Sequence, residues 1–316
     1  SAAYRVTDYL RYVNTIEADW QVRNWVGLHI GYRYTHRKVD VVGYNQTLTS
    51  TTNPNPVTLT PEEEKNSTNT IIAGMKIKPM KNWAIFWDLE HGDADNVFTA
   101  VENYKFTNFR IRSRWSFDKF VLNLSGISKD NTNPTGSSTG TIDFAVNSKS
   151  RIYSGSLDWN PDPRFWLTTG YTYTHMTSLA AIVVNSPARQ GISQYFVRDH
   201  SFFIDASARA NKRVSFYGSY RINKDRGQGD IPLTDPYYVL IGNTSVSLTR
   251  PQDIISSYPM TFQSPEFRVA FRITRNIDWN IGYQYFDYKE KYQTIQDYKA
   301  HLPYTSLKFY FGNTDR

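Results

Sequence analysis

The sequence predicts an all-β protein, a transmembrane antiparallel β-barrel, from three observations. Aromatic residues make up 16% of the 316 residues, yet the mean hydropathy is −0.55. No stretch approaches the roughly eighteen apolar residues of a membrane helix. Short segments of alternating apolar and polar residues recur along the chain, and tight turns alternate with long polar connections, as in membrane-spanning barrels.

The strands are expected wherever side chains alternate with a period of two. The alternation is clearest at 214–222, 267–273 and 279–285, where aromatic and branched residues share one side and polar residues the other. About thirteen strands result, and their centres lie near residues 14, 30, 74, 88, 112, 124, 155, 169, 204, 218, 270, 283 and 309.

The connections between these strands fall into two classes. Six tight turns carry polar residues or proline, which short hairpins need: Arg23-Asn24, Lys81-Asn82, Asp118-Lys119, Asn160 to Pro163, Asn211-Lys212 and Asn276-Ile277. Six long connections rich in Asn, Thr, Ser, Pro, Asp and Gly are expected at 46–68, 92–105, 128–148, 176–198, 224–262 and 288–303. The segment Tyr237–Leu248 could form a hairpin within the fifth of them.

Tryptophan placement separates a membrane barrel from a soluble β-sandwich, which would also alternate. Indole is amphipathic and prefers the boundary between the lipid and the headgroups. Seven of the eight tryptophans flank tight turns and predict one girdle at the periplasmic interface: Trp20, Trp25, Trp83, Trp115, Trp159, Trp166 and Trp279. The eighth, Trp87, lies further into its strand.

The strand count predicts how the chain relates to a complete barrel. Bacterial single-chain barrels normally have an even number of strands, whereas thirteen is odd. The first strand would also run from the outer rim down to the periplasmic turn. We therefore expect residues 1–316 to be a single barrel domain, the C-terminal portion of a longer chain and part of a larger even-stranded barrel.

The face opposite the aromatic residues is expected to line the lumen, and it is rich in basic residues. The lumenal basic candidates are Arg110, Arg112, Arg114, Arg221, Arg268 and Arg272. Acidic residues such as Asp88, Asp158 and Asp205 fall on the same face. One interpretation is a hydrated wall with cross-paired charges. The other takes Arg110, Arg112 and Arg114 as a ladder that favours anions or docks an acidic partner.

Composition narrows the function classes. The net charge is +7, with a pI near 9.3, but the basic residues are spread through the strands, so nucleic acid is not an expected partner. Without cysteine the chain has no disulfide and no haem attachment motif of its own. The six histidines are scattered. We therefore expect no enzymatic activity, no catalytic or metal site and no cofactor in this chain.

Several sequence blocks carry a family resemblance. They are Gly92 to Phe98, Arg221 to Asp225, Ser264-Pro265-Glu266, Trp279 to Tyr285 and Leu302 to Leu307. Together they resemble large bacterial outer-membrane barrels and, more loosely, the decahaem-associated porin-cytochrome barrel family. The resemblance implies an outer-membrane protein that sheathes a periplasmic multihaem cytochrome, with haem on that partner, so that electrons cross the membrane.

Three function hypotheses follow for a bacterial outer-membrane protein in contact with the lipid bilayer. The first is a conduit or scaffold whose lumen holds a partner such as a multihaem cytochrome. The second is a porin or uptake channel with a basic lumen. The third is a structural or adhesive surface protein that uses its long loops.

Overall fold

The computed structural model describes residues 2–45, 58–96, 103–136, 143–183, 190–230, 237–241, 244–248, 259–291 and 294–311. Within these ranges nearly all residues lie in β-strands, and a single 3-10 turn, η1 (Thr294–Gln296), precedes the last strand. No helix in the described ranges has the length and apolar character needed to cross a membrane.

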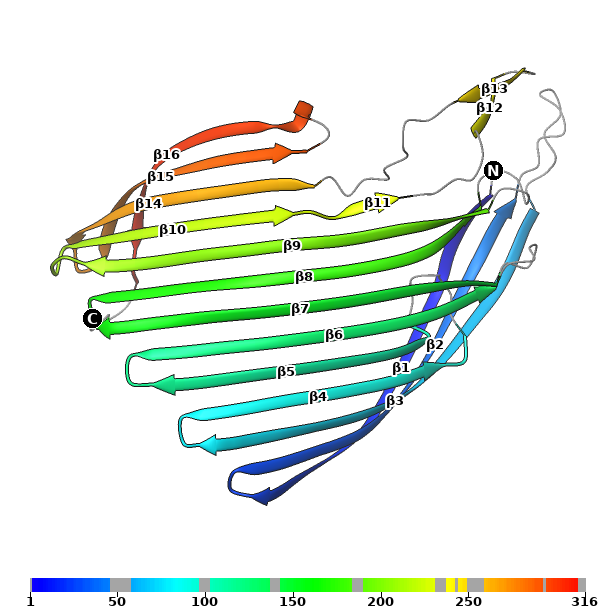
Figure 1. The fold of residues 1–316 in the computed structure, drawn as a ribbon, viewed down its shortest axis with the longest axis horizontal. Helices are drawn as coiled ribbons and strands as arrows, with labels where there is room; N and C mark the ends of the chain where they lie inside the picture. The colour runs from blue at the N-terminus through cyan, green and yellow to red at the C-terminus, as the bar shows by residue number, and fades with distance from the viewer. Residues whose placement is uncertain are drawn as a thin grey trace.

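Thirteen antiparallel strands form the main path of one sheet, in which they pair in chain order, with β14 next to β10 (Figure 1). In sheet order these strands are β1 (Ala2–Arg23), β2 (Val26–Asn45), β3 (Thr58–Met80), β4 (Trp83–Ala94), β5 (Lys105–Phe117), β6 (Phe120–Gly136), β7 (Asp143–Asp162), β8 (Phe165–Val183), β9 (Gln190–Arg209), β10 (Val214–Asp225), β14 (Met260–Thr274), β15 (Ile277–Glu290) and β16 (Tyr298–Phe309). The all-β class and the thirteen strands predicted from the sequence are confirmed.

Three further strands lie off this path. β11 (Gln228–Asp230) pairs with β9, while β12 (Tyr237–Ile241) and β13 (Thr244–Leu248) form a separate hairpin. The hairpin considered for Tyr237–Leu248 is therefore present. At the ends of the main path, no backbone pairing joins β1 to β16 among the described residues, so the sheet has two open edges.

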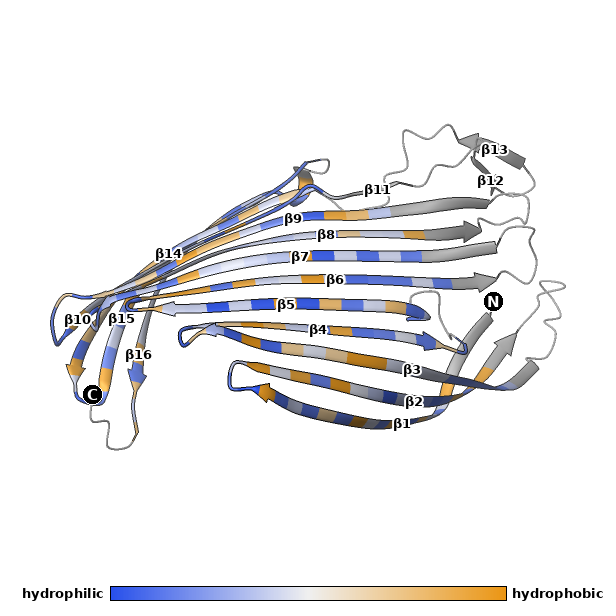
Figure 2. Cartoon of the chain, turned by 60° about the horizontal axis from the view of Figure 1, so that its bottom comes forward, coloured by the Kyte–Doolittle hydropathy of each residue, from blue (hydrophilic) through white to orange (hydrophobic). Residues whose placement is uncertain are grey.

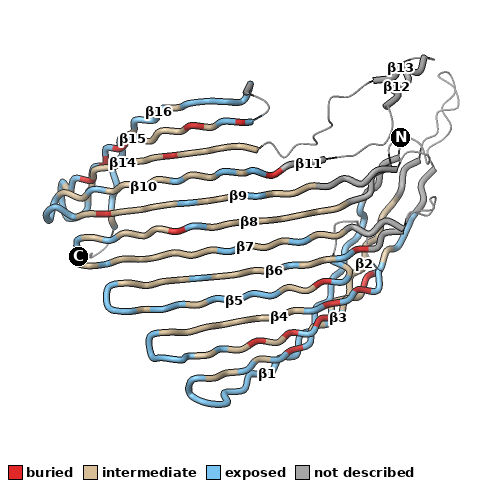
Figure 3. The backbone as a smooth tube through the Cα atoms, in the orientation of Figure 1, coloured by how far each residue is buried: buried red, intermediate tan, exposed pale blue. Residues whose placement is uncertain are grey.

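The sheet is a single curved layer, and it has almost no protein core (Figure 1). In the described part of the chain, the only buried apolar side chains are those of Ile72, Ala94, Phe106 and Ala270. Most of the backbone is intermediate or exposed (Figure 3). A β-sandwich would bury apolar side chains between two sheets, so the sandwich alternative is excluded for the described residues.

The register sorts the side chains into two faces, because directly paired residues of antiparallel strands point to the same side. One face carries an apolar belt across all thirteen strands. It comprises Ile16, Ala18, Trp20, Leu28, Ile30, Tyr32, Ile71, Ala73, Met75, Ile85, Trp87, Leu89, Phe109, Ile111, Ser113, Trp115, Phe120, Leu122, Leu124, Tyr153, Gly155, Leu157, Leu167, Thr169, Tyr171, Phe202, Ile204, Ala206, Phe216, Gly218, Tyr220, Phe267, Val269, Phe271, Trp279, Ile281, Tyr283, Pro303, Thr305 and Leu307. These belt positions include no charged side chain.

The opposite face, here called the charged face, carries the intervening residues of the same strands. The alternation of apolar and polar positions is visible along several strands, such as β1, β2 and β5 (Figure 2). Many belt side chains are uncovered: Ile30 is 63% exposed, Ile71 58% and Phe267 53%. A contiguous apolar surface of this kind marks a site of contact with lipid or with another protein.

All six predicted long connections are wrong in extent, because each overlaps strands of the structure. Strand pairing continues through 58–68, 128–136, 143–148, 176–183, 190–198 and 298–303, which the sequence patterning assigned to long connections. The reason is that the sequences of these segments lack a strict alternation of apolar and polar residues, as in the charged run Glu62 to Lys65, although their backbones still pair. The terminal strand, predicted to be centred near residue 309, begins at Tyr298 and ends at Phe309.

Cross-strand ion pairs stabilise these polar extensions. Lys38 Nζ lies 3.3 Å from Asp40 Oδ2 and 2.7 Å from Glu63 Oε2, and Lys65 also contacts Glu63. Hydrogen bonds from Lys38 and Lys65 lower the pKa of Glu63 to about 2. The extension of β2 and β3 thus replaces apolar packing with paired charges beyond the belt.

One tight turn depends on an unusual backbone conformation. Asp118 has a φ of 46°, the only positive value of a residue other than glycine in the described ranges. It forms, with Lys119, the two-residue link between paired Phe117 and Phe120. Such hairpins favour Asn, Asp or Gly because left-handed backbone is costly for other residues.

We expect Asp118→Val to lower the free energy of unfolding by about 1–2 kcal/mol, since valine tolerates a left-handed conformation poorly. Asp118→Gly and Asp118→Asn should stay near the wild-type value. Denaturant unfolding of the full chain, refolded in detergent micelles, measures the difference. An equal loss in the valine and glycine variants would assign the role to the carboxylate instead of the backbone.

Candidate functional site: a charged face opposite the apolar belt

The predicted arginine ladder lies on the charged face of β5. Register places Arg110, Arg112 and Arg114 opposite Asp88, Phe86 and Ala84 of β4. On the other side, the β6 partners of the ladder are Ile127, Ser125 and Asn123. Because alternate residues of a strand share a face, the three guanidinium groups stand in one column.

Among the residues that the structure describes, only the middle arginine of this ladder has a carboxylate as an ion-pair partner. Arg112 Nη2 lies 3.5 Å from Asp88 Oδ2, and its guanidinium carbon lies 5.8 Å from the centroid of the Phe86 ring. Both partners of the ion pair are about half exposed, so the pair contributes little stability. In the described part of the chain, no carboxylate forms an ion pair with Arg110 or Arg114, which leaves a local excess of positive charge.

A hollow of about 490 Å³ lies beside the ladder. Arg112, Arg114 and Phe86 line one side and Phe203 the other, while Ser125, Ser154, Ser156 and Thr172 supply small hydroxyl groups between them. Small side chains on β6 and β7 leave this space open between the two phenylalanines. The combination of guanidinium and hydroxyl donors suits an anionic group.

The position of Phe203 depends on a glycine in the neighbouring strand. Gly170 pairs directly with Phe203, and a Cβ at residue 170 would lie 2.4 Å from Phe203 Cε1. The ring therefore packs over the glycine backbone, an arrangement that fixes cross-strand register in twisted sheets. The contact between Phe203 and Gly170 therefore helps to fix the register of β8 and β9 and also positions the ring that lines the hollow.

The other three predicted lumenal arginines lie on the charged face of β10 and β14, several strands away from the ladder. Arg221 Nη2 lies 3.8 Å from Asp205 Oδ2, and Arg272 Nε lies 3.5 Å from Asp278 Oδ1. The Arg268 guanidinium stacks 4.2 Å from the centroid of the Tyr217 ring. This region matches the interpretation of a cross-paired wall, whereas the ladder does not.

The tryptophans beside the short turns fall mostly on the apolar face. Trp20, Trp83, Trp115, Trp159 and Trp279 share it with the belt. Trp83 Nε1 donates to Ser113 Oγ at 2.9 Å, and Trp279 Nε1 donates to Thr305 Oγ1 at 2.7 Å. Indoles that keep a polar contact inside an apolar surface are typical of membrane boundaries.

Two of the predicted girdle members are placed differently. Trp25 lies in the turn between β1 and β2, where its backbone carbonyl accepts from Lys78 N at 2.7 Å. Trp166 pairs with Ser207, which pairs with Tyr217 and so lies on the charged face. The reason is register: Trp159 pairs with Leu167, and the residue before Leu167 points to the opposite side.

Phenylalanines complete the aromatic row, and the sequence interpretation omitted them. Consecutive ring centroids lie 6.1 Å apart for Trp83–Trp115, 5.2 Å for Trp115–Phe117, 5.3 Å for Phe117–Phe120, 5.9 Å for Phe120–Trp159 and 5.4 Å for Trp159–Phe165. Their signal was available, since Phe117 and Phe120 flank the Asp118-Lys119 turn as closely as any tryptophan flanks its own.

The described residues contain no group of three or more His, Asp or Glu side chains arranged to hold a metal ion. His29 pairs with Asp19 on the charged face, with 2.9 Å between Nδ1 and Oδ1. The expected absence of catalytic and cofactor sites stays a prediction.

Solved structures of outer-membrane proteins match this chain. A loop-deletion mutant of OmpT, an outer membrane protein of Vibrio cholerae, is 8% identical with a TM-score of 0.35, covering 98% of this chain and 99% of that one. The NanC porin is 11% identical with a TM-score of 0.27, covering 77% and 93%. The ferric-catecholate import receptor Fiu of E. coli is 7% identical with a TM-score of 0.39, covering 95% and 65%.

No family model matches the chain, and no curated protein sequence does. At these identities and TM-scores, the structural matches carry no argument about function. The function has to be inferred from the charged face and the apolar belt instead.

We expect Asp88→Asn to increase the affinity of the charged face for a pyrene tetrasulfonate probe about fivefold, because it frees Arg112 and removes a negative charge. Arg114→Gln should weaken the same probe by a similar factor. Fluorescence titration at low and high salt measures both, and screening should shrink each effect. Equal affinities for wild type and both variants would show that the ladder does not act as an anion site.

Proposed function

We propose that this chain forms the wall of a bacterial outer-membrane β-barrel whose charged face lines a conduit for an anionic occupant. The observation that carries the proposal is the apolar belt. It crosses all thirteen strands of a single-layer sheet, contains no charged side chain and is opposed by a polar face. Lipid is the solvent that matches such a surface.

Strand length supports the same proposal. The shortest strands of the main path, β4, β10 and β16, have 12 residues each. A tilted strand needs about 9–11 residues to cross the hydrocarbon core. Every strand of the sheet is therefore long enough, and the polar extensions of the longer ones would continue into water.

The edges of the sheet left unpaired among the described residues, at β1 and β16, bear on the size of the proposed barrel. In a bilayer, unpaired backbone N–H and C=O groups at a lipid-exposed edge would each cost several kcal/mol. β1 and β16 therefore need partners within the membrane, and we propose that further strands of a larger barrel supply them. Residues 1–316 would then be one portion of a single barrel domain.

The basic ladder and its hollow support a conduit or scaffold. An interior with unpaired arginines attracts a partner whose surface is acidic. The family resemblance of the sequence makes a periplasmic multihaem cytochrome the proposed partner, with electron transfer across the outer membrane as the proposed role. The barrel itself would position that partner and hold no haem.

A porin with a basic lumen is the second candidate, and the hollow beside Arg112 and Arg114 favours it. A constriction lined by guanidinium and hydroxyl groups would select small anions without any protein partner. Both candidate functions require the same membrane wall. They differ in what occupies the interior of the barrel, a protein partner or small anions.

The membrane wall is tested by two neighbouring residues of β9. Phe202→Arg should destabilise the barrel in lipid by about 2–4 kcal/mol, because the charge would enter the belt. Ser201→Arg is the matched control, since residue 201 points to the charged face, where it pairs with Thr172 and Asn223. Folding free energies in phosphatidylcholine vesicles measure both. Similar values for the two variants would contradict the assignment of the belt to lipid.

The conduit and the porin are separated by the full-length protein, extracted gently from native membranes. The conduit predicts a stoichiometric partner with haem absorbance, released more readily by salt when Arg110, Arg112 and Arg114 are changed to Gln. Lys119→Gln, in a turn, is the control. A bare barrel that conducts anions in planar bilayers, with selectivity lost in the triple variant, would replace the conduit by the porin.

A further inference from the structure

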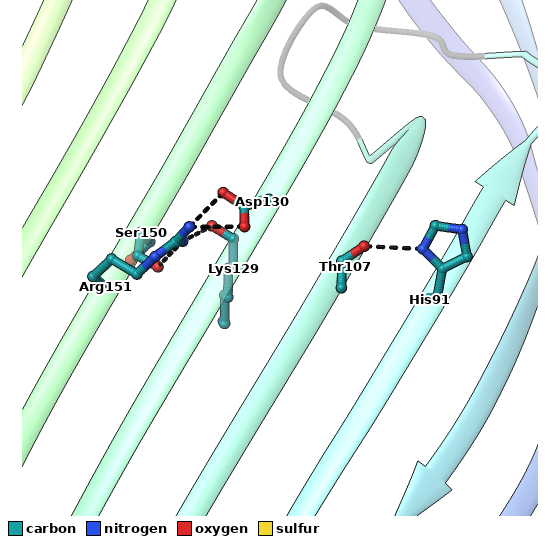
Figure 4. Close-up of polar contacts among 6 residues, drawn as sticks. All are labelled: His91, Thr107, Lys129, Asp130, Ser150 and Arg151. Atoms are coloured by element: carbon teal, nitrogen blue, oxygen red, sulfur yellow. Dashed lines mark hydrogen bonds and ion pairs between the residues drawn. The ribbon is translucent and has the colours of Figure 1, made fainter.

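Five of the six histidines follow the edge of the apolar belt that lies away from the short turns: His36, His91, His175, His200 and His301. Hydroxyl groups from neighbouring strands contact four of these rings, for example at 2.6 Å for Tyr171–His200 and 3.0 Å for Ser67–His36. The contact of 2.9 Å between Thr107 and His91 is drawn in Figure 4. The belt thus ends in a band of amphipathic rings, as it does in tryptophan at its other edge.

Cationic side chains begin in the same band. In the ladders of β7, β8 and β9, Arg151 stands opposite His175, and His175 opposite Arg198. His200 in turn stands opposite Lys224 of β10. Neighbouring strands lie about 4.8 Å apart, so Arg151, His175 and Arg198 form one lateral row, and His200 and Lys224 belong to the next row toward the belt. Arg151 is held by a fork of hydrogen bonds of 2.9 and 2.8 Å to Asp130, whereas the described ion pairs do not include Arg198 or Lys224 (Figure 4).

The row of His200 and Lys224 ends at a hollow of about 400 Å³ where β10 meets β14 and β15. Lys224, Arg226, Lys289 and Lys291 contribute to its lining, together with Asp225 and Glu290. Lys224 and Lys289 follow the apolar face by register.

Both acids of the hollow are already engaged by the protein. Asp225 Oδ1 accepts from Gly227 N at 2.6 Å, and Glu290 Oε1 accepts from Tyr288 Oη at 2.6 Å. Lys289 Nζ lies 3.8 Å from Asp287 Oδ2, a loose contact that leaves the ammonium accessible. The neutral donors Gly227 N and Tyr288 Oη leave both carboxylates negative, but four basic side chains against two acidic ones give the lining an excess of positive charge. Lys224 and Lys289 place part of that charge on the side of the sheet that carries the belt.

We propose that the patch formed by Arg198, Lys224, Arg226 and Lys289 binds the phosphate groups of anionic lipids packed against the belt. The inference rests on the proposed membrane wall, because acyl chains that cover the belt would bring their headgroups to this level. Phosphate suits guanidinium and ammonium donors, and clustered Lys and Arg beside an apolar surface are typical of anionic lipid binding. Lipid, rather than free phosphate, is the source because the patch adjoins the belt.

The test is native mass spectrometry of the full-length protein in detergent, titrated with a bis-phosphorylated glucosamine lipid or with phosphatidylcholine. We expect the phosphorylated lipid to bind preferentially, and Lys224→Gln/Arg226→Gln/Lys289→Gln to weaken it about tenfold or more. Lys212→Gln/Arg213→Gln/Arg275→Gln removes three basic residues at the turn edge and is the matched control. It should bind like wild type.

Three outcomes would overturn the proposal: unchanged binding in the first triple variant, equal loss in the control, or displacement of the lipid by millimolar inorganic phosphate. Insertion into phosphatidylcholine vesicles, measured separately, reports on the membrane wall. If the chain inserts into vesicles but binds both lipids equally, only the proposed lipid site is contradicted. If the chain inserts into no vesicle, the proposed membrane wall is contradicted as well.

Discussion

The apolar belt has no protein layer over it, and this constraint governs the rest of the structure. In an ordinary globular domain, a sheet face of this length would pack against helices or a second sheet. Here the described residues provide a single layer with four buried apolar side chains. The stability of the fold must therefore come from backbone pairing, cross-strand contacts and a surrounding solvent that is itself apolar.

The register of the strands determines which side chains lie on the belt and which lie on the charged face. Since a shift of one residue would exchange the two faces of a strand, the devices that fix register also keep charge out of the belt. The Asp118 turn, the Phe203 ring over Gly170 and the aromatic row from Trp83 to Phe165 all act in this way. Their effect on the charged face is equally direct, because they hold the arginine ladder in one column.

The sequence predicted most of the architecture where hydrophobicity alternates. All thirteen strands and the face of each ladder arginine followed from period-two patterning, because the residues of the belt and those of the charged face differ strongly in polarity. The polar extensions escaped prediction because residues such as Glu63 and Lys65 alternate charge with charge. Trp166 was misplaced because proximity to a turn does not fix parity. Ion pairing was beyond sequence too: nothing in the spacing distinguishes Arg112, which contacts Asp88, from Arg114, which does not.

The strand extensions beyond the belt have a consequence for how this rim of the sheet would meet other molecules. These segments form hydrogen-bonded ladders rather than independent loops, so adjacent surface residues often come from two different strands, as Asp130 of β6 and Arg151 of β7 do. An antibody or phage that recognises this rim would read a folded, discontinuous epitope. Short peptides copied from single segments would reproduce little of it.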